Sequence, residues 1–95
     1  MTTKLHSADI QTMVHDWAVA DGGFDAPYGI LTGEHTNAKG KKYKSVTFGY
    51  ARTMDATVEI YNSNFMLFKC SRMFNPRVFK SADNLMAYLT NKEFV

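Results

Sequence analysis

The sequence of 95 residues predicts a single α+β domain, 1–95, with an N-terminal helix, a four- to five-stranded antiparallel sheet and a C-terminal helix. Three observations lead to this prediction. Apolar residues recur at helical spacing near both ends of the chain, apolar and polar residues alternate through its middle, and the links between the predicted strands are short. Short links favour antiparallel hairpins, because a parallel connection needs a crossover of a dozen or more residues.

The first helix is expected to follow Ser7, whose hydroxyl can cap a free backbone N–H, and Asp9 in the first turn suits the helix dipole. Gly22-Gly23 is expected to end the helix, because glycine adopts the left-handed cap conformation at low cost. The stretch Asp25-Ala26-Pro27 then favours an extended path into the sheet. One helical face is apolar and is formed by Ile10, Met13, Val14, Trp17 and Ala18.

A period-two pattern predicts the strands, and polar segments rich in Gly, Asn and Asp predict the turns between them. The expected strands are Tyr28–Gly33, Lys42–Arg52, Thr57–Tyr61, Phe65–Ser71 and a short Arg77–Phe79. The expected connections are Glu34–Lys41, Thr53–Asp55, Asn62–Asn64 and Arg72–Pro76. A second helix should begin after Ser81 as its cap, with an apolar face of Ala82, Leu85, Met86 and Leu89.

The hairpin around Asn62-Ser63-Asn64 allows two registers, and they differ in which side chains face the core. A two-residue loop places Phe65 and Leu67 inward and leaves Met66 and Phe68 on the second face. A three-residue loop places Met66 and Phe68 inward and leaves Phe65 and Leu67 outward beside Tyr61. Either register puts two large apolar residues on the second face, where a helix of this chain or another protein would have to cover them.

Composition bounds the class of protein. Hydrophobic residues make up 45% and charged residues 21%, as in an ordinary globular domain. The single Cys70 cannot form an internal disulfide, and the longest strongly apolar run, Phe65–Phe68, is far short of the ~20 residues that span a bilayer. The first six residues lack the apolar stretch of a secretion signal. We therefore expect a cytoplasmic protein with no membrane segment.

Charge is unevenly distributed and favours nucleic acid as one partner. Residues 1–38 carry one basic and five acidic residues, whereas residues 39–95 carry ten basic and four acidic ones. The stretch KGKKYK holds four lysines that can contact phosphate and one tyrosine, Tyr43, that can stack on a base. Lys42 and Lys44 share parity with inward-facing residues, so Tyr43 points to the other side of the strand. The nucleic-acid-binding residues predicted are Lys39, Lys41, Lys42, Tyr43, Lys44 and Arg52.

A protein partner or a homodimer is the alternative. The large apolar side chains of the second sheet face would form the contact surface, with Tyr61, Phe65, Met66 and Phe68 as its predicted residues. On this interpretation the chain is a small inhibitor or adaptor, of the kind that phages and mobile elements use to block a host defence or transcription machine. Lysines at hairpin tips also protect sheet edges from aggregation, which weakens the inference to nucleic acid.

Catalytic and metal-binding patterns are weak. His6, His15 and His35 are scattered, and the Asp21–Asp25 stretch resembles a calcium loop but lacks the further oxygen ligands and the closing glutamate. Cys70 lies in an apolar strand, where free cysteine usually behaves as a small buried hydrophobe. No glycine-rich phosphate loop and no paired acid and base occur. We expect a non-enzymatic protein with no metal, no cofactor and no small-molecule substrate.

Overall fold

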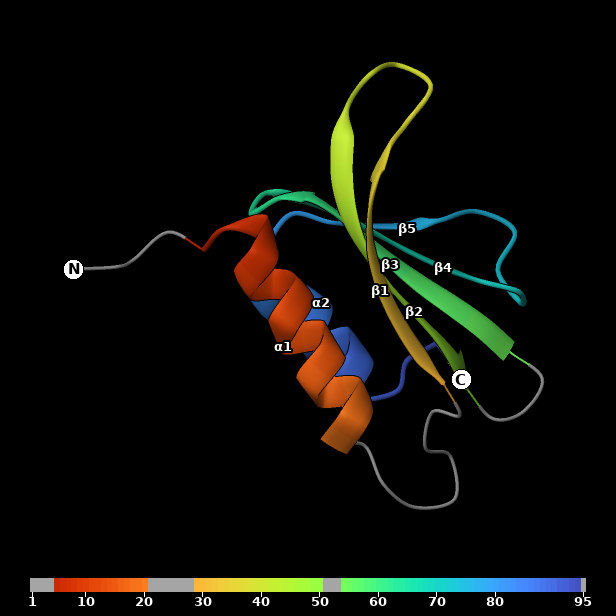
Figure 1. Ribbon diagram of the computed structural model, residues 1–95. Coiled ribbons are helices and arrows are strands. Elements are labelled where there is room, and N and C mark those ends of the chain that lie inside the picture. Colours follow the sequence, from red (N-terminus) through yellow and green to blue (C-terminus); the bar gives the residue numbers. More distant parts are fainter. Residues whose placement is uncertain (1–4, 21–28, 51–53, 95) are drawn as a thin grey trace.

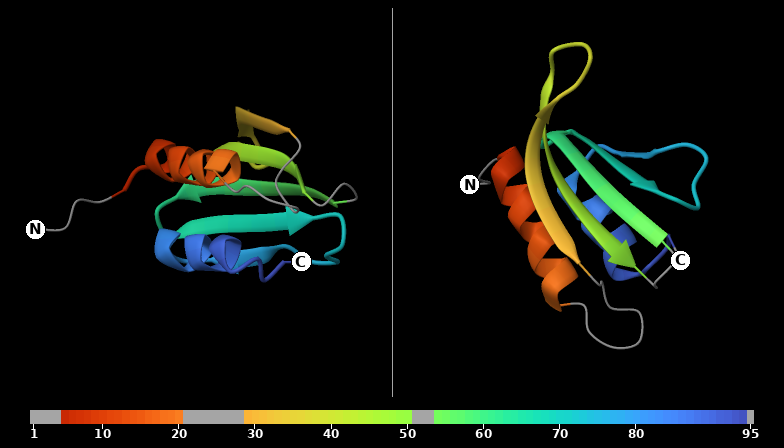
Figure 2. Two further views of the ribbon diagram at one scale, coloured as in Figure 1. Left: turned by 90° about the horizontal axis from the view of Figure 1, so that it is seen from below. Right: turned by 45° about the vertical axis from the view of Figure 1, so that its right-hand side comes forward.

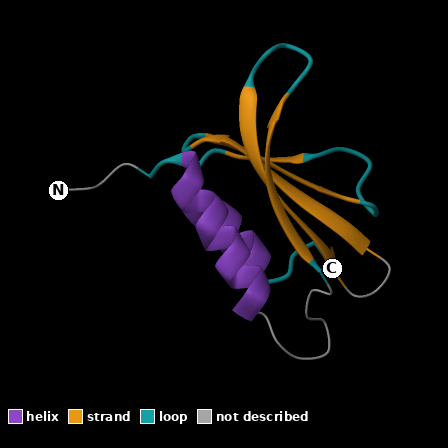
Figure 3. Ribbon diagram, in the orientation of Figure 1, coloured by secondary structure: helices purple, strands orange, loops and turns teal. Residues whose placement is uncertain are grey.

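The α+β prediction is confirmed by a computed structural model that describes residues 5–20, 29–50 and 54–94. Its five strands form one antiparallel sheet in chain order, with a helix before the first strand and another after the last (Figures 1 and 3). The elements are α1 (Ser7–Ala20), β1 (Ile30–Thr36), β2 (Lys42–Tyr50), β3 (Met54–Asn62), β4 (Phe65–Cys70), β5 (Arg77–Phe79) and α2 (Ala82–Thr90).

Both helices pack on the same face of the sheet, and the hydrophobic core lies between them and the strands (Figure 2). α1 buries Ile10, Val14 and Ala18, three members of the predicted apolar face. The strands contribute alternate residues, because successive side chains of a strand point to opposite faces. The fully buried large side chains are Ile10, Val14, Val46, Phe48, Tyr50, Met54, Val58, Ile60, Met66, Phe68, Leu85 and Leu89.

The two helix starts differ from one another. The prediction for α2 is confirmed, because the Ser81 hydroxyl accepts a hydrogen bond from the backbone N–H of Asn84 at 3.2 Å. The prediction for α1 is wrong in its detail. Ser7 is the first helical residue, and the Asp9 carboxylate accepts the backbone N–H of His6 at 2.9 Å, so Asp9 closes the first turn.

The first hairpin is longer than predicted. β1 continues through Glu34–Thr36, which the polar pattern assigns to the loop, because these residues pair with the lysine-rich start of β2. The loop itself is short, and the Asn37 side chain organises it by accepting the N–H groups of Lys39 and Lys41 at 2.9 and 3.0 Å. Gly40 completes the turn with φ +82°, a conformation that glycine adopts without strain.

Two further boundaries can be compared with the prediction. β3 begins at Met54, not at Thr57, so Met54 and Asp55 belong to the strand and not to the turn. The predicted helix end at Gly22-Gly23, the stretch Asp21–Pro27, the strand start at Tyr28 and the strand end at Arg52 lie outside the described residues.

A β-bulge resolves the register of the β3–β4 hairpin. Asn62 pairs with Phe65 across a two-residue turn, but the pairing then shifts, and Ile60 lies opposite Met66. The extra residue at this point turns Met66 and Phe68 inward, as the longer-loop alternative predicts. Both side chains are fully buried in the core. Their assignment to a protein interface is therefore wrong, because the two helices already cover them.

Candidate functional site

The second face of the sheet is the candidate site, because both helices pack on the opposite face and no described element covers this one (Figure 2). In the middle of this open face, neighbouring strands place Ser45, Glu59, Leu67 and Val78 side by side. Ser45 and Glu59 are largely buried there by the larger side chains around them. Toward the β1–β2 hairpin loop, the side chains of this face are aromatic rings in contact with one another.

Four rings cross the open face from strand to strand, and we call them the aromatic row: His35 on β1, Tyr43 on β2, Tyr61 on β3 and Phe65 on β4. Successive ring centroids lie 5.2, 5.1 and 5.4 Å apart. Each step matches the ~4.7–4.9 Å spacing of neighbouring strands. The planes of successive rings are inclined to each other by 36°, 34° and 53°. Each ring is therefore in contact with the next, and the row is continuous.

Polar contacts order the β1 end of the row. The Nε2 atom of His35 lies 3.0 Å from the hydroxyl oxygen of Ser45. The imidazole occupies this position because residue 33 is glycine: a Cβ there would meet His35 Nε2 at 3.0 Å. The Asn37 side-chain amide donates to the Tyr61 hydroxyl at 3.4 Å and so ties the hairpin loop to the row.

A helix side chain holds the same strand pair from the other face. The Gln11 side-chain amide of α1 donates to the backbone carbonyls of Gly33 and Ser45, at 3.1 Å in each case. These partly buried hydrogen bonds connect α1 to β1 and β2 directly behind the His35–Ser45 contact. These bonds from α1 therefore stabilise the backbone of β1 and β2 beneath the β1 end of the row.

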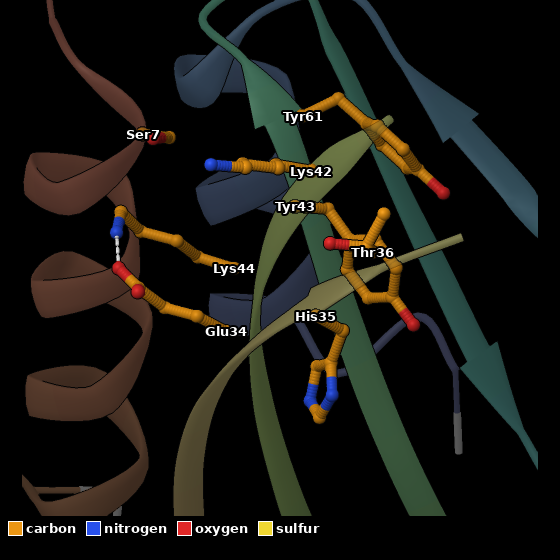
Figure 4. Close-up of a pocket in the computed structure, with 8 residues that line it drawn as sticks. All are labelled: Ser7, Glu34, His35, Thr36, Lys42, Tyr43, Lys44 and Tyr61. Atoms are coloured by element: carbon orange, nitrogen blue, oxygen red, sulfur yellow. Dashed lines mark hydrogen bonds and ion pairs between the residues drawn. The ribbon is translucent and has the colours of Figure 1, made fainter. Parts of the chain in front are cut away.

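Lysines border the row at the hairpin end. Lys39, Lys41 and Lys42 line a hollow of about 660 Å³ together with Tyr61 and Phe65. Its remaining lining residues are Asn37, Asn62 and Leu67, so no carboxylate lies in its wall. The ammonium end of Lys42 projects toward α1, which leaves Lys39 and Lys41 as the lysines of the hairpin loop beside the row (Figure 4). At Phe65, the last ring of the row on β4, the Lys80 ammonium lies 5.1 Å from the ring centre, in a cation–π arrangement.

Lys44 does not belong to this surface. Glu34, Lys42 and Lys44 project toward α1, whereas His35, Tyr43 and Tyr61 project to the opposite side (Figure 4). Lys44 forms an ion pair with Glu34, and its hydrogen bond holds the pKa of the Glu34 carboxyl below the usual value. Lys44 therefore lies apart from the open face, and its role as a phosphate contact stays a prediction. The pair lies in a second hollow of about 490 Å³, which Lys42 also borders.

Among the described residues, the open face has one largely buried carboxylate, and it is paired with a lysine. Glu59 lies beside the row and pairs with Lys69 at 3.0 Å. The hydrogen bond to Glu59 raises the pKa of the Lys69 ammonium, although partial burial acts in the opposite direction. An anionic ligand on the aromatic row would therefore meet an ion pair here and not an isolated negative charge.

The His35–Ser45 contact has the distance of a base and a nucleophile, but its surroundings do not suit catalysis. Ser45 is only 5% exposed and lies beneath its neighbours, so a substrate has little access to its hydroxyl. The contact serves to orient the imidazole. Among the described residues, no group of three or more His, Cys, Asp or Glu side chains is placed to hold a metal ion. Within the same residues, neither helix is long and apolar enough to cross a membrane.

The structure joins two sites that the sequence predicts separately. Tyr43, from the lysine-rich segment, contacts Tyr61, from the predicted protein interface, and Phe65 follows next in the row. His35 is missing from both predictions, although its spacing of two from Gly33 places it on the same face as Tyr43 once β1 is extended. Arg52, the sixth predicted nucleic-acid contact, lies outside the described residues.

Comparisons of the chain with protein-family models, with curated proteins and with solved structures gave no match.

Proposed function

We propose that this chain is a non-enzymatic protein that binds nucleic acid on its open sheet face. The observation that carries the proposal is the aromatic row beside a hollow that is lined by the hairpin-loop lysines Lys39 and Lys41 and is free of carboxylates. Nucleic acid offers the two groups that this surface suits. Phosphates pair with lysine ammonium groups and release counterions, and bases stack on aromatic rings.

The distribution of charge supports the same ligand. The exposed acidic residues Asp9 and Asp16 lie on α1, which packs on the opposite face of the sheet. Glu34 and Glu59 are each paired with a lysine. Asp55 is an exposed carboxylate of the open face, but it lies at the opposite end of β3 from Tyr61. A polyanion that approaches the row from the hairpin side therefore meets Lys39 and Lys41 first, although the net charge of the whole chain is only +2. The single cysteine supports a reducing compartment such as the cytoplasm as part of this proposal.

The test is fluorescence anisotropy of labelled single- and double-stranded oligonucleotides between 50 and 200 mM salt, a range over which roughly 10³-fold or larger losses are known for multi-contact binders. We expect affinity to fall with salt. A double variant, Lys39→Ala and Lys41→Ala, should lower the slope of log affinity against log salt by up to about 1.4, at ~0.7 per lost contact for a single strand.

Arg72→Ala is the matched control, because it removes one exposed positive charge beyond the other end of β4. Its salt slope should equal that of the parent. Absence of binding to any oligonucleotide at about 50 mM salt, where phosphate contacts are strongest, would overturn the proposal.

Protein binding is the second candidate function, and a specific observation favours it. Leu31 is 73% and Val78 48% exposed, on the two edge strands of the open face. Together with the aromatic row they give this face an apolar character that a protein partner or a second copy would also fit. As an inhibitor or adaptor, the chain would use Tyr61 and Phe65 as its anchors.

A further inference from the structure

We infer that the ligand of the open face is an unpaired strand of DNA or RNA, bound across the β-strands with about four nucleotides on the aromatic row. This inference rests on the proposed function and names its substrate. It follows from the geometry of the rings, from the position of the cations and from the way in which bases are exposed in paired and unpaired strands.

The rings of the row accept bases on their outer surface only. Two bases or rings that hold a third between them stand about 7 Å apart, twice the ~3.4 Å stacking distance of nucleic acid. The ring centroids of the row are 5.1–5.4 Å apart, so no base fits between neighbours. A base can therefore stack only where a ring is left open by its neighbours, so the row of four rings takes at most about four nucleotides. At Phe65 the base would share the ring with, or displace, the Lys80 ammonium.

Stacking on this surface requires a base whose face is free. In a duplex the base faces are covered by their neighbours, and only the edges are accessible from the grooves. In an unpaired strand the bases can turn outward and stack on aromatic side chains. The aromatic row lies against the sheet on four neighbouring strands, and its members are half-buried apart from the exposed His35. It therefore suits base faces and not groove edges.

The cations indicate where the sugar–phosphate chain runs. Lys39 and Lys41 lie in the hairpin loop above the row, and Lys80 lies beyond its Phe65 end. On the opposite side of the row, Lys69 is already paired with Glu59. The phosphates therefore follow the hairpin side, from β1 toward β5, and the bases point toward the middle of the sheet.

The Asn62 side chain lines the same hollow at the β3–β4 turn. Its carbonyl oxygen accepts the backbone N–H of Asn64 at 2.8 Å, and its amide NH₂ group can still donate a hydrogen bond. An amide at this position can donate to a base acceptor at the Phe65 end of the row. This is the place where a preference among bases would arise.

The experiment compares thymidine oligonucleotides of two to ten residues, the matching oligouridines, a tetranucleotide-length strand without bases, and a duplex. Affinity should rise steeply up to about four nucleotides and slowly thereafter, since additional length adds only overlapping sites. The strand without bases and the duplex should each bind at least roughly tenfold more weakly, as the loss of one moderate stack implies.

Phe65→Leu tests the row directly, and Phe74→Leu is its matched control. Phe74 is 98% exposed in the loop after β4, at the other end of that strand from Phe65. Phe65→Leu should weaken binding of a tetranucleotide by at least about 5-fold, the lower bound for the loss of a base–aromatic stack. Phe74→Leu should leave binding unchanged. Tyr61→Leu gives a second, independent variant of the row.

The outcomes separate the inference from the proposed function. Salt-dependent binding in which the duplex or the strand without bases equals the normal single strand overturns the inference and leaves the proposed function standing. Equal losses for Phe65→Leu and Phe74→Leu do the same. Absence of binding to every probe overturns both. The two measurements on the parent protein decide the matter even where a variant folds poorly.

Discussion

Phe68→Ala and Phe65→Ala, two changes three residues apart on β4, should have opposite consequences for folding and for binding. Phe68 is fully buried, with its ring centroid 5.3 Å from that of Tyr88 and 5.1 Å from that of Phe94. Truncation of such a core phenylalanine costs about 3–5 kcal/mol. A domain of this length has a free energy of unfolding of about 5–14 kcal/mol, so the variant should fold but lose much of its stability.

Phe65 is half-buried on the open face and has a smaller role in stability. Its ring contacts Tyr61 at 5.4 Å and Lys80 at 5.1 Å. The loss of one aromatic pair and one cation–π contact amounts to about 1–2.5 kcal/mol. Phe65→Ala should nevertheless be the variant that binds nucleic acid more weakly, whereas folded Phe68→Ala should bind like the parent protein.

Urea unfolding followed by circular dichroism measures the first effect, and anisotropy with a labelled tetranucleotide measures the second. The free energies of unfolding of the two variants should differ by at least about 0.5 kcal/mol, with Phe68→Ala the less stable. If Phe65→Ala proves as destabilising as Phe68→Ala or more so, the bulge near Tyr61 is misplaced. A one-residue slip would exchange the faces of both side chains.

Three further predictions concern the surroundings of the row. A Cβ on Gly33 would lie 3.0 Å from His35 Nε2, so Gly33→Ala should displace the imidazole and weaken binding of the oligonucleotide. The free energy of unfolding should change by less than about 1 kcal/mol. An unchanged His35 signal in NMR spectra would contradict this prediction. The folded state raises the pKa of Lys69, through its acidic partner, and of Tyr88, through burial. Both groups hold their protons more tightly when folded, so this stability is present below about pH 10 and is lost as pH rises through the raised pKa values; urea unfolding from pH 8 to 11 should show the decline, and a rise would refute it. Because Leu31 is 73% exposed, Leu31→Lys should alter the free energy of unfolding by no more than about 0.5 kcal/mol. If light scattering shows that the parent is a dimer and that Leu31→Lys is a monomer, the protein-binding candidate is favoured instead.

The sequence predicts the elements of this fold well where one face of an element is buried. The spacing of Ile10, Val14 and Ala18 predicts α1, and the alternation from Val46 to Tyr50 predicts β2. Both patterns are local and reflect burial against the same core. The end of β1 is different, because Glu34–Thr36 are polar on both faces and a polar strand end has the composition of a loop.

The candidate site depends on contacts that local patterns do not contain. The faces of Phe65 and Met66 follow from a bulge, and the hairpin sequence permits the register with it and the register without it. The contact between Tyr43 and Tyr61 requires both this register and the pairing of β2 with β3. For this reason the lysine-rich segment and the apolar hairpin look like two alternative sites in the sequence and form one surface in the fold.

Lys44 illustrates a second limit. Its place among four closely spaced lysines suggests a phosphate contact, yet strand pairing sets it opposite Glu34, and the two side chains form an ion pair away from the open face. A cluster of charges in sequence is therefore an upper bound on the cations available to a ligand. In this chain the strand alternation divides the cluster between two sides of the sheet.

The most direct test of the central claim is a titration of ¹⁵N-labelled protein with a thymidine tetranucleotide, followed by amide chemical shifts. If the row binds the strand, the largest changes should fall on the aromatic row and on the hairpin loop that carries Lys39 and Lys41, with α2 unaffected. Changes confined to α1 and α2, or no changes at all, would contradict this claim.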